Sequence, residues 1–124
     1  MSSSYIGRFA PSPSGSLHFG SLVAAVASYC DARANDGKWL VRIEDVDGSR
    51  TIDGAADDIL RTLEGFGMYW DGDVVWQSQR SEFYGEIVRS LKSKGQAFDC
   101  ACTRKRLLGQ KLYPGFCRNG LPEG

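Results

Sequence analysis

The residues with the clearest chemical potential lie in one run, Arg8–Ser21, which is rich in glycine, proline and serine. Its prolines exclude a helix, and its glycines let the backbone approach a ligand closely. The helix expected to follow would offer unpaired backbone N–H groups and the positive end of its dipole to this loop. Such a junction is suited to the phosphates of a nucleotide, with His18, the only histidine, as a further donor.

Two charged residues, Arg8 and Glu44, close predicted apolar strands. The guanidinium fork of Arg8 can hold a carboxylate through two hydrogen bonds, which makes it a candidate ligand-binding residue. The simpler alternatives for Arg8 are a surface charge or an ion pair with Glu44. For Asp45, Asp47 and Arg50, a network of turn contacts is the favoured interpretation.

Three of the four cysteines, Cys100, Cys102 and Cys117, crowd into a short segment. This spacing is more typical of a metal site than of a secreted disulfide scaffold. Three thiolates are one ligand short of a closed zinc site, which leaves a carboxylate, a water or a phenol such as Tyr113 as the fourth ligand. The alternative is a group of reduced buried thiols with Tyr113 as a packing residue. Cys30 is expected to be a small core residue.

Strand and helix patterns alternate along the chain, which predicts an α/β fold with a Rossmann-like parallel sheet. Such sheets bind ligands beyond the carboxyl ends of their strands, where the His18 loop and Glu44 both fall. The pattern predicts strands over Tyr5–Ala10, Lys38–Ile43 and Val74–Trp76, an extended stretch over Gln96–Asp99, and helices over Leu22–Ala34, Gly54–Phe66, Ser81 to Gly95 and Arg104–Lys111.

Local signals refine these elements. Asp53 is expected to cap the second helix and Gly67 to end it. An apolar stripe is predicted on the third helix, formed by Phe83, Ile87, Val88 and Leu91. Core positions, rather than positions that stack on bases, are predicted for Trp39, Trp70 and Trp76.

The overall composition is that of one small domain. The 124 residues carry 15 basic and 15 acidic side chains, so no overall positive field indicates a nucleic-acid partner. Neither a long apolar run nor a signal segment occurs, and we expect a cytoplasmic protein with no membrane partner. A local basic cluster near the cysteines is either a solvated surface or a contact for tRNA phosphates: Arg104, Lys105, Arg106, Lys111 and Arg118.

The N-terminal run resembles the first signature of class I aminoacyl-tRNA synthetases, above all of their glutamate branch. Arg8–Ser12 reads Arg-Phe-Ala-Pro-Ser, and the signature tetrad reads His18-Phe19-Gly20-Ser21, with serine in place of the second histidine of the general pattern. This form is similar to that of the glutamyl-Q tRNA(Asp) synthetases, which attach glutamate to queuosine in the anticodon of tRNA(Asp). The similarity extends over Trp39–Asp45, Tyr69–Asp73, Trp76–Arg80 and the cysteine segment, and so covers nearly the whole chain.

The resemblance implies specific roles. His18 would stabilise charge on the ATP phosphates while the glutamate carboxylate attacks the α-phosphate, and Glu44 would hold the substrate ammonium. It implies that glutamate contacts Arg8, Phe9, Ala10, Pro11, Ser12 and Glu44, that the nucleotide contacts Pro11, Ser14, Gly15, His18, Phe19, Gly20 and Ser21, and that zinc is held by Cys100, Cys102, Tyr113 and Cys117. The implied partners are ATP with Mg²⁺, glutamate, structural Zn²⁺ and queuosine-containing tRNA(Asp), and we expect a monomer.

The second class I signature, a Lys-Met-Ser-Lys-Ser-like loop, does not occur in this sequence. We therefore expect the N-terminal part of a longer enzyme, inactive alone, with half of a catalytic domain over residues 1–99 and a truncated zinc-binding segment over 100–124. A close alternative is a discriminating glutamyl-tRNA synthetase, which charges the 3′ end of tRNA. A rival of another class is a zinc-dependent RNA-binding module without catalysis.

Overall fold

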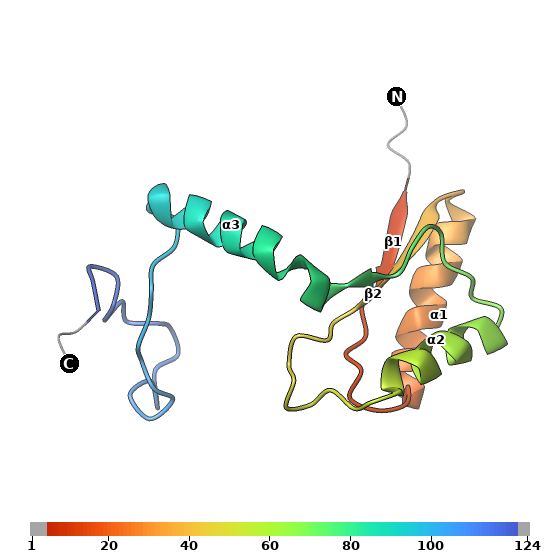
Figure 1. Cartoon of the computed structure of the whole chain (residues 1–124), viewed down its shortest axis with the longest axis horizontal. Coiled ribbons are helices and arrows are strands. Elements are labelled where there is room, and N and C mark those ends of the chain that lie inside the picture. Colours follow the sequence, from red (N-terminus) through yellow and green to blue (C-terminus); the bar gives the residue numbers. More distant parts are fainter. Residues whose placement is uncertain (1–4, 122–124) are drawn as a thin grey trace. The chain divides into compact units, whose positions relative to one another are not determined.

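Three short parallel strands organise the first part of the chain (Figure 1). β1 (Ile6–Phe9) pairs with β2 (Lys38–Ile43), and β2 pairs with β3 (Val75–Trp76), so β2 is the central strand. The helix α1 (Phe19–Ala34) connects β1 to β2, and α2 (Ala55–Gly65) lies between β2 and β3 in the chain. The predicted α/β fold with a parallel sheet is thereby confirmed.

The computed structural model describes residues 5–121, and its chain divides into two units between Ser81 and Glu82. The first unit holds the sheet, α1, α2 and the short 3-10 helix η1 (Gln77–Arg80); the second holds most of α3 (Ser81–Ser93) and the cysteine segment. The sequence predicted a different division, into a catalytic part over residues 1–99 and a zinc-binding segment over 100–124, and this division stays a prediction. Residues 1–4 of the first part and 122–124 of the second lie outside the described residues. No helix within residues 5–121 is long and apolar enough to cross a membrane.

Alternation along the strands gives the sheet two different faces. In β2 the side chains of Trp39, Val41 and Ile43 are buried, whereas Leu40 and Arg42 between them are partly exposed. Because successive side chains of a strand point to opposite faces, the buried set lies on one face and the partly exposed set on the other. The buried face forms the core together with Phe9 of β1 and with residues of both helices: Ala25, Ala32, Ile59 and Leu63.

β1 lies very close to α1 at Gly7. A Cβ atom added to Gly7 would stand 3.0 Å from Ala32 Cβ and 3.0 Å from the Ser28 carbonyl oxygen. Trp39 Nε1 donates to Ser28 Oγ at 2.9 Å, which fixes the same part of the helix against β2. The absence of a side chain at Gly7 therefore lets the C-terminal half of α1 approach the sheet closely.

Gly7→Ala is expected to destabilise the fold by about 1–3 kcal/mol, the scale of overpacking in a closed core. The measurement is the free energy of unfolding from denaturant titration. Gly48→Ala is the matched control, because a Cβ at Gly48 would meet no atom within 4 Å. Equal stability of the two variants would show that the close approach at Gly7 is not required.

An ionic contact fastens the beginning of β2 to the turn before β3. The Asp71 carboxylate accepts hydrogen bonds from the backbone N–H of Trp39 at 2.7 Å and from Arg33 at 2.8 Å. Arg33 also donates to the Tyr69 carbonyl oxygen at 2.7 Å. The Asp71 carboxylate thus links the last turn of α1, the start of β2 and the 69–71 turn, and the backbone hydrogen bond from the Asp71 N–H to the Trp39 carbonyl oxygen reinforces the link.

The structure corrects two helix starts. α1 begins at Phe19 rather than Leu22, because His18 acts as its cap. Asp53 does not cap α2: Gly54 occupies the cap position with φ +78°, and no side chain there accepts a backbone hydrogen bond. At the other end of α2 the prediction is confirmed, since Gly67 follows the helix with φ +73°, a conformation that favours glycine.

Residues 96–99, predicted to be extended, belong to no helix or strand. Two further predictions are wrong. Residues 104–109 form successive turns, and no basic helix spans residues 104–111. Cys30 is exposed on α1 and is not a core residue. The tryptophan prediction holds, since Trp39 is buried and Trp70 and Trp76 pack against the core. The apolar stripe of α3 is present but remains partly exposed: Phe83, Ile87, Val88 and Leu91.

Candidate functional site

Two prolines attach the N-terminal loop to the segment that follows β2. The Pro11 carbonyl oxygen accepts a hydrogen bond from the Glu44 N–H at 2.9 Å, and the Pro13 carbonyl oxygen accepts one from the Ile52 N–H at 2.9 Å. Proline has no backbone donor but keeps its carbonyl acceptor, so both links run in this direction. The carboxyl ends of β1 and β2 are thereby held together, with Glu44 beside the loop.

His18 occupies the cap position of α1. Its Nδ1 accepts from the Ser21 N–H at 3.2 Å, and its Nε2 lies 3.0 Å from Ser21 Oγ. A Cβ at Gly20 would stand 3.2 Å from the His18 ring, so glycine leaves room for the imidazole at the helix start. In this structure the ring accepts a hydrogen bond from the helix, whereas the sequence predicted a donor to phosphate.

The loop and the helix start enclose an open depression of about 330 Å³. Pro11, Ser14, Gly15, His18 and Ser21, all predicted nucleotide contacts, line it. Phe19 and Gly20 are not among its lining residues, and the Phe19 side chain is 82% exposed. The depression therefore unites most, but not all, of the predicted nucleotide-binding residues beside the positive end of α1.

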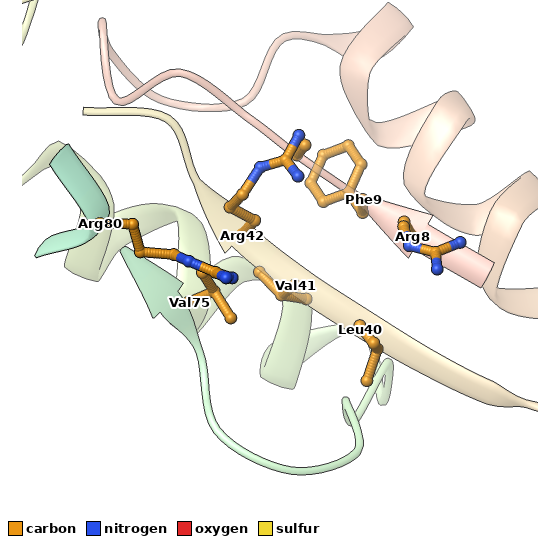
Figure 2. A pocket seen from close by; sticks show the side chains of 8 residues that line it. Arg8, Phe9, Leu40, Val41, Arg42, Val75 and Arg80 are labelled. Carbon is orange, nitrogen blue, oxygen red and sulfur yellow. The ribbon is translucent and has the colours of Figure 1, made fainter. Parts of the chain in front are cut away.

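A second pocket, of about 150 Å³, lies on the sheet next to this depression, and three arginines line it. Figure 2 shows that Arg8 comes from β1, Arg42 from β2 and Arg80 from η1, with apolar residues of the strands between them. Arg8 Nη1 donates to the Ile6 carbonyl oxygen at 3.2 Å. We call this the arginine pocket; its positive charge suits a carboxylate ligand.

The two cavities share the end of β1. Phe9 and Ala10, both predicted glutamate contacts, line the arginine pocket and also the depression beside His18. Ser12 lines the depression and, together with Glu44, a small crevice beside it. The predicted glutamate contacts are thus distributed over three neighbouring cavities rather than gathered in one.

Glu44 pairs with Arg42 and not with Arg8. Arg42 Nη2 donates to Glu44 Oε1 at 2.6 Å, which corrects the alternative interpretation of Arg8 as the partner of Glu44. Asp45 accepts two hydrogen bonds from Ser78, which lower the pKa of its carboxyl group against the opposing effect of burial. The predicted turn network is confirmed only for Asp47 and Arg50, whose side chains meet at 2.7 Å.

In the second unit, three thiols and a phenol converge. Cys102 Sγ lies 3.7 Å from Cys117 Sγ, and Tyr113 Oη lies 3.4 Å from Cys100 Sγ and 3.8 Å from Cys102 Sγ. The three sulfur atoms are all within 4.8 Å of one another. The Cys117 N–H donates to Tyr113 Oη at 2.9 Å and orients the phenol oxygen toward the thiols. We call these four residues the cysteine cluster.

The cysteine cluster favours ionisation of one thiol. When Cys100 ionises, Tyr113 can donate to it; this hydrogen bond, followed by one from the Cys102 backbone, lowers the pKa of Cys100 to about 7. The same contact raises the pKa of Tyr113, and burial raises that of Cys102. Because the thiolate is the form that binds metals, Cys100 is the ligand best prepared at neutral pH.

Three of the distances in the cysteine cluster are close to those expected around a tetrahedral zinc ion. Zn–S bonds of about 2.3 Å and a Zn–O bond of about 2.0 Å place sulfur atoms about 3.8 Å apart and sulfur and oxygen about 3.5 Å apart. The observed separations of 3.7 Å, 3.4 Å and 3.8 Å are close to these values. The donor set of three thiols and one phenol is therefore compatible with zinc.

Two pocket residues of the first unit were not predicted as site residues from the sequence. Arg42 and Arg80 line the arginine pocket together with Arg8. A signal for Arg42 existed, since it stands only two residues before Glu44, close to the carboxyl end of the predicted strand. Arg80 had no such signal, because only the fold of η1 brings it to the sheet.

Comparison with known proteins gives a family for most of the chain. Residues 6–113 match the family model described as tRNA synthetases class I (E and Q), catalytic domain. A glutamyl-Q tRNA(Asp) synthetase of Aromatoleum aromaticum is 60% identical over 97% of the chain and 40% of its own length. The protein of the same name from Dechloromonas aromatica is 57% identical over 100% of the chain and 44% of its own length. The chain thus spans about two fifths of the length of these relatives.

Solved structures agree with this family. A glutamate tRNA ligase from Elizabethkingia meningosepticum, in complex with its amino acid, matches with a TM-score of 0.74 and 32% identity over 82% of this chain and 22% of its own. Glutamate-tRNA synthetase from Elizabethkingia anophelis matches with a TM-score of 0.73 and 30% identity over 84% of this chain and 23% of its own.

Proposed function

The chain belongs to the catalytic-domain family of class I tRNA synthetases for glutamate and glutamine, and from this we propose that it is the N-terminal part of a glutamyl-Q tRNA(Asp) synthetase. The protein would use ATP to activate glutamate and would transfer the glutamyl group to queuosine in tRNA(Asp). The observation that carries this proposal is the pair of adjoining cavities at the end of β1, one beside a helix N-terminus and one lined by arginines.

The arrangement suits a reaction between two bound substrates. ATP, with Mg²⁺, would place its phosphates in the depression beside His18, and glutamate would lie toward the arginine pocket and Glu44. Phe9 and Ala10 stand between the two, where the substrate carboxylate can attack the α-phosphate and displace pyrophosphate. No covalent enzyme intermediate is needed, so positioning and stabilisation of phosphate charge supply the catalysis.

The cysteine cluster would hold a structural zinc ion through Cys100, Cys102, Tyr113 and Cys117. Bound there, zinc would cross-link the segment, which has few regular hydrogen-bonded elements of its own. Two basic side chains of this segment lie over aromatic rings, Arg106 on Phe116 and Arg118 on Phe98. The other basic residues of the predicted tRNA contact remain candidates for binding phosphate: Arg104, Lys105 and Lys111.

The test is ATP–pyrophosphate exchange by the full-length protein with glutamate, measured with and without tRNA. A glutamyl-Q enzyme is expected to exchange without tRNA, whereas a glutamyl-tRNA synthetase generally requires it. Transfer of labelled glutamate to queuosine-containing tRNA(Asp), but not to the 3′ end of tRNA(Glu), would complete the assignment. Zinc-dependent RNA binding without any exchange would favour the non-catalytic module. A cytoplasmic monomer remains our expectation.

Arg8→Lys should weaken the use of glutamate in the full-length protein. Lysine keeps the charge but loses the planar fork, so kcat/KM for glutamate is expected to fall by the equivalent of about 1.5–3 kcal/mol. The KM for ATP should change little, because Arg8 is not among the residues that line the depression beside His18. An unchanged kcat/KM for glutamate would remove Arg8 from the site.

A further inference from the structure

We propose that Arg42 is a positioning residue of the glutamate site: it holds one oxygen of Glu44 so that the other stays directed to the ammonium group of the substrate. This inference rests on the proposed function and adds a residue to it. It starts from the 2.6 Å contact between Arg42 Nη2 and Glu44 Oε1. Both side chains are partly buried, with exposed fractions of 42% and 32%.

The backbone places the pair in a fixed relation. Arg42 belongs to β2, and Glu44 follows that strand with its N–H bonded to the Pro11 carbonyl oxygen. Only Ile43 separates the two residues along the chain, and the guanidinium of Arg42 meets the carboxylate of Glu44 just beyond the end of the strand. Glu44 is therefore fixed through its main chain by the nucleotide-binding loop and through its side chain by Arg42.

The environment of Arg42 argues against a purely structural role. Its Nε is buried, and among the described residues it has no hydrogen-bond partner. A buried donor without a partner is costly, and a merely packed position on this face would be served by an apolar side chain such as neighbouring Leu40. The contact with Glu44 offsets the cost of burying the Arg42 Nε donor, and an apolar side chain could not make that contact.

The arrangement leaves groups of both signs for a zwitterionic substrate. Glutamate brings an ammonium group for Glu44 and carboxylates for arginine. In this structure Arg8 donates to the Ile6 carbonyl oxygen and not to Glu44, while Arg42 takes one oxygen of Glu44. A carboxylate has two oxygens and can accept several hydrogen bonds, so Glu44 Oε2 remains an acceptor for the substrate.

The test compares two ligands of the full-length protein, L-glutamate and glutarate, which is the same dicarboxylate without the amine. If Arg42 acts through Glu44, Arg42→Gln weakens binding of glutamate by about tenfold, the scale of one charge-assisted hydrogen bond, and leaves glutarate binding unchanged. Arg42→Lys, which keeps a charged donor, recovers most of the loss. Arg61→Gln, a charge removal on the exposed side of α2, is the control and changes neither ligand.

The outcomes separate the proposal from its alternatives. Equal losses for glutamate and glutarate would overturn it, because they would mean that Arg42 binds a substrate carboxylate or only supports the fold. Unchanged glutamate binding by Arg42→Gln would overturn it as well. If wild-type protein binds no glutarate, a double-mutant comparison replaces the glutarate measurement. Adding Arg42→Gln to the Glu44→Gln variant must then cause no further loss of glutamate binding. Absence of glutamate-dependent exchange in the wild type would instead refute the proposed function.

Discussion

Replacement of Cys100 or Cys117 by serine is expected to abolish zinc binding and to unfold the segment around the cysteine cluster. Wild-type protein should contain about one zinc ion per chain, since the four donors match one tetrahedral site. Structural zinc contributes roughly 10–16 kcal/mol of apparent binding free energy in small zinc domains, which is folding free energy where the apo segment is unfolded. Metal analysis of protein purified without chelators, with amide hydrogen exchange over residues 98–121, measures both effects.

The chain provides a matched control for this experiment. Cys30 is exposed on α1 and lies outside the cysteine cluster, so Cys30→Ser should keep the full zinc content and normal protection of the segment. Tyr113→Phe tests the fourth ligand alone, because it removes only the phenol oxygen. Wild-type protein that contains no zinc would contradict the assignment of the cluster as a metal site.

His18→Ala is expected to reduce glutamyl-adenylate formation by the full-length protein by a factor of about 10² or more. This is the scale of losing one positioned donor to a charged transition state. The alanine variant also removes the cap of α1, which costs about 0.5–2 kcal/mol of stability. Single-turnover formation of the adenylate and the free energy of unfolding therefore have to be measured together.

His18→Asn separates the two roles. Asparagine is a favourable cap residue, so its side-chain oxygen can accept the Ser21 N–H in place of the imidazole, and stability should return toward that of the wild type. Adenylate formation should remain low, because the imidazole is absent. Recovery of activity with the asparagine cap would mean that His18 serves the helix and not the phosphates.

Much of the first unit could be predicted from the sequence because its signals are local. In Lys38–Ile43 the β-forming residues Trp39, Val41 and Ile43 recur at every second position, and β2 has those same bounds. Gly67 ends α2 as expected because a left-handed residue after a helix favours glycine. The candidate residues at the ends of β1 and β2 come together because parallel strands share one carboxyl edge, which the alternation of strands and helices already implied.

Contacts between distant segments could not be predicted in the same way. Glu44 pairs with Arg42, two residues before it in the chain, whereas Arg8 lies on the neighbouring strand opposite Leu40. The segment 104–111 has the composition of a basic helix, yet it forms turns between two halves of the cysteine cluster, where tertiary constraints override a weak propensity. His18 as a helix cap was missed because histidine is not among the usual cap residues.

The carboxylate that fastens the start of β2 makes this region sensitive to acid. The hydrogen bond from the Trp39 N–H, followed by that from Arg33, lowers the pKa of Asp71 below that of an unfolded chain. A group with a lowered pKa stabilises the fold above its unfolded value, near 3.9, and loses that contribution as pH falls through the folded value. Acidification would therefore weaken the contacts of the Asp71 carboxylate with Trp39 and Arg33 at the end of β2 opposite to Glu44. The backbone hydrogen bond from the Asp71 N–H to the Trp39 carbonyl oxygen and the bond from Arg33 to the Tyr69 carbonyl oxygen do not titrate and would remain.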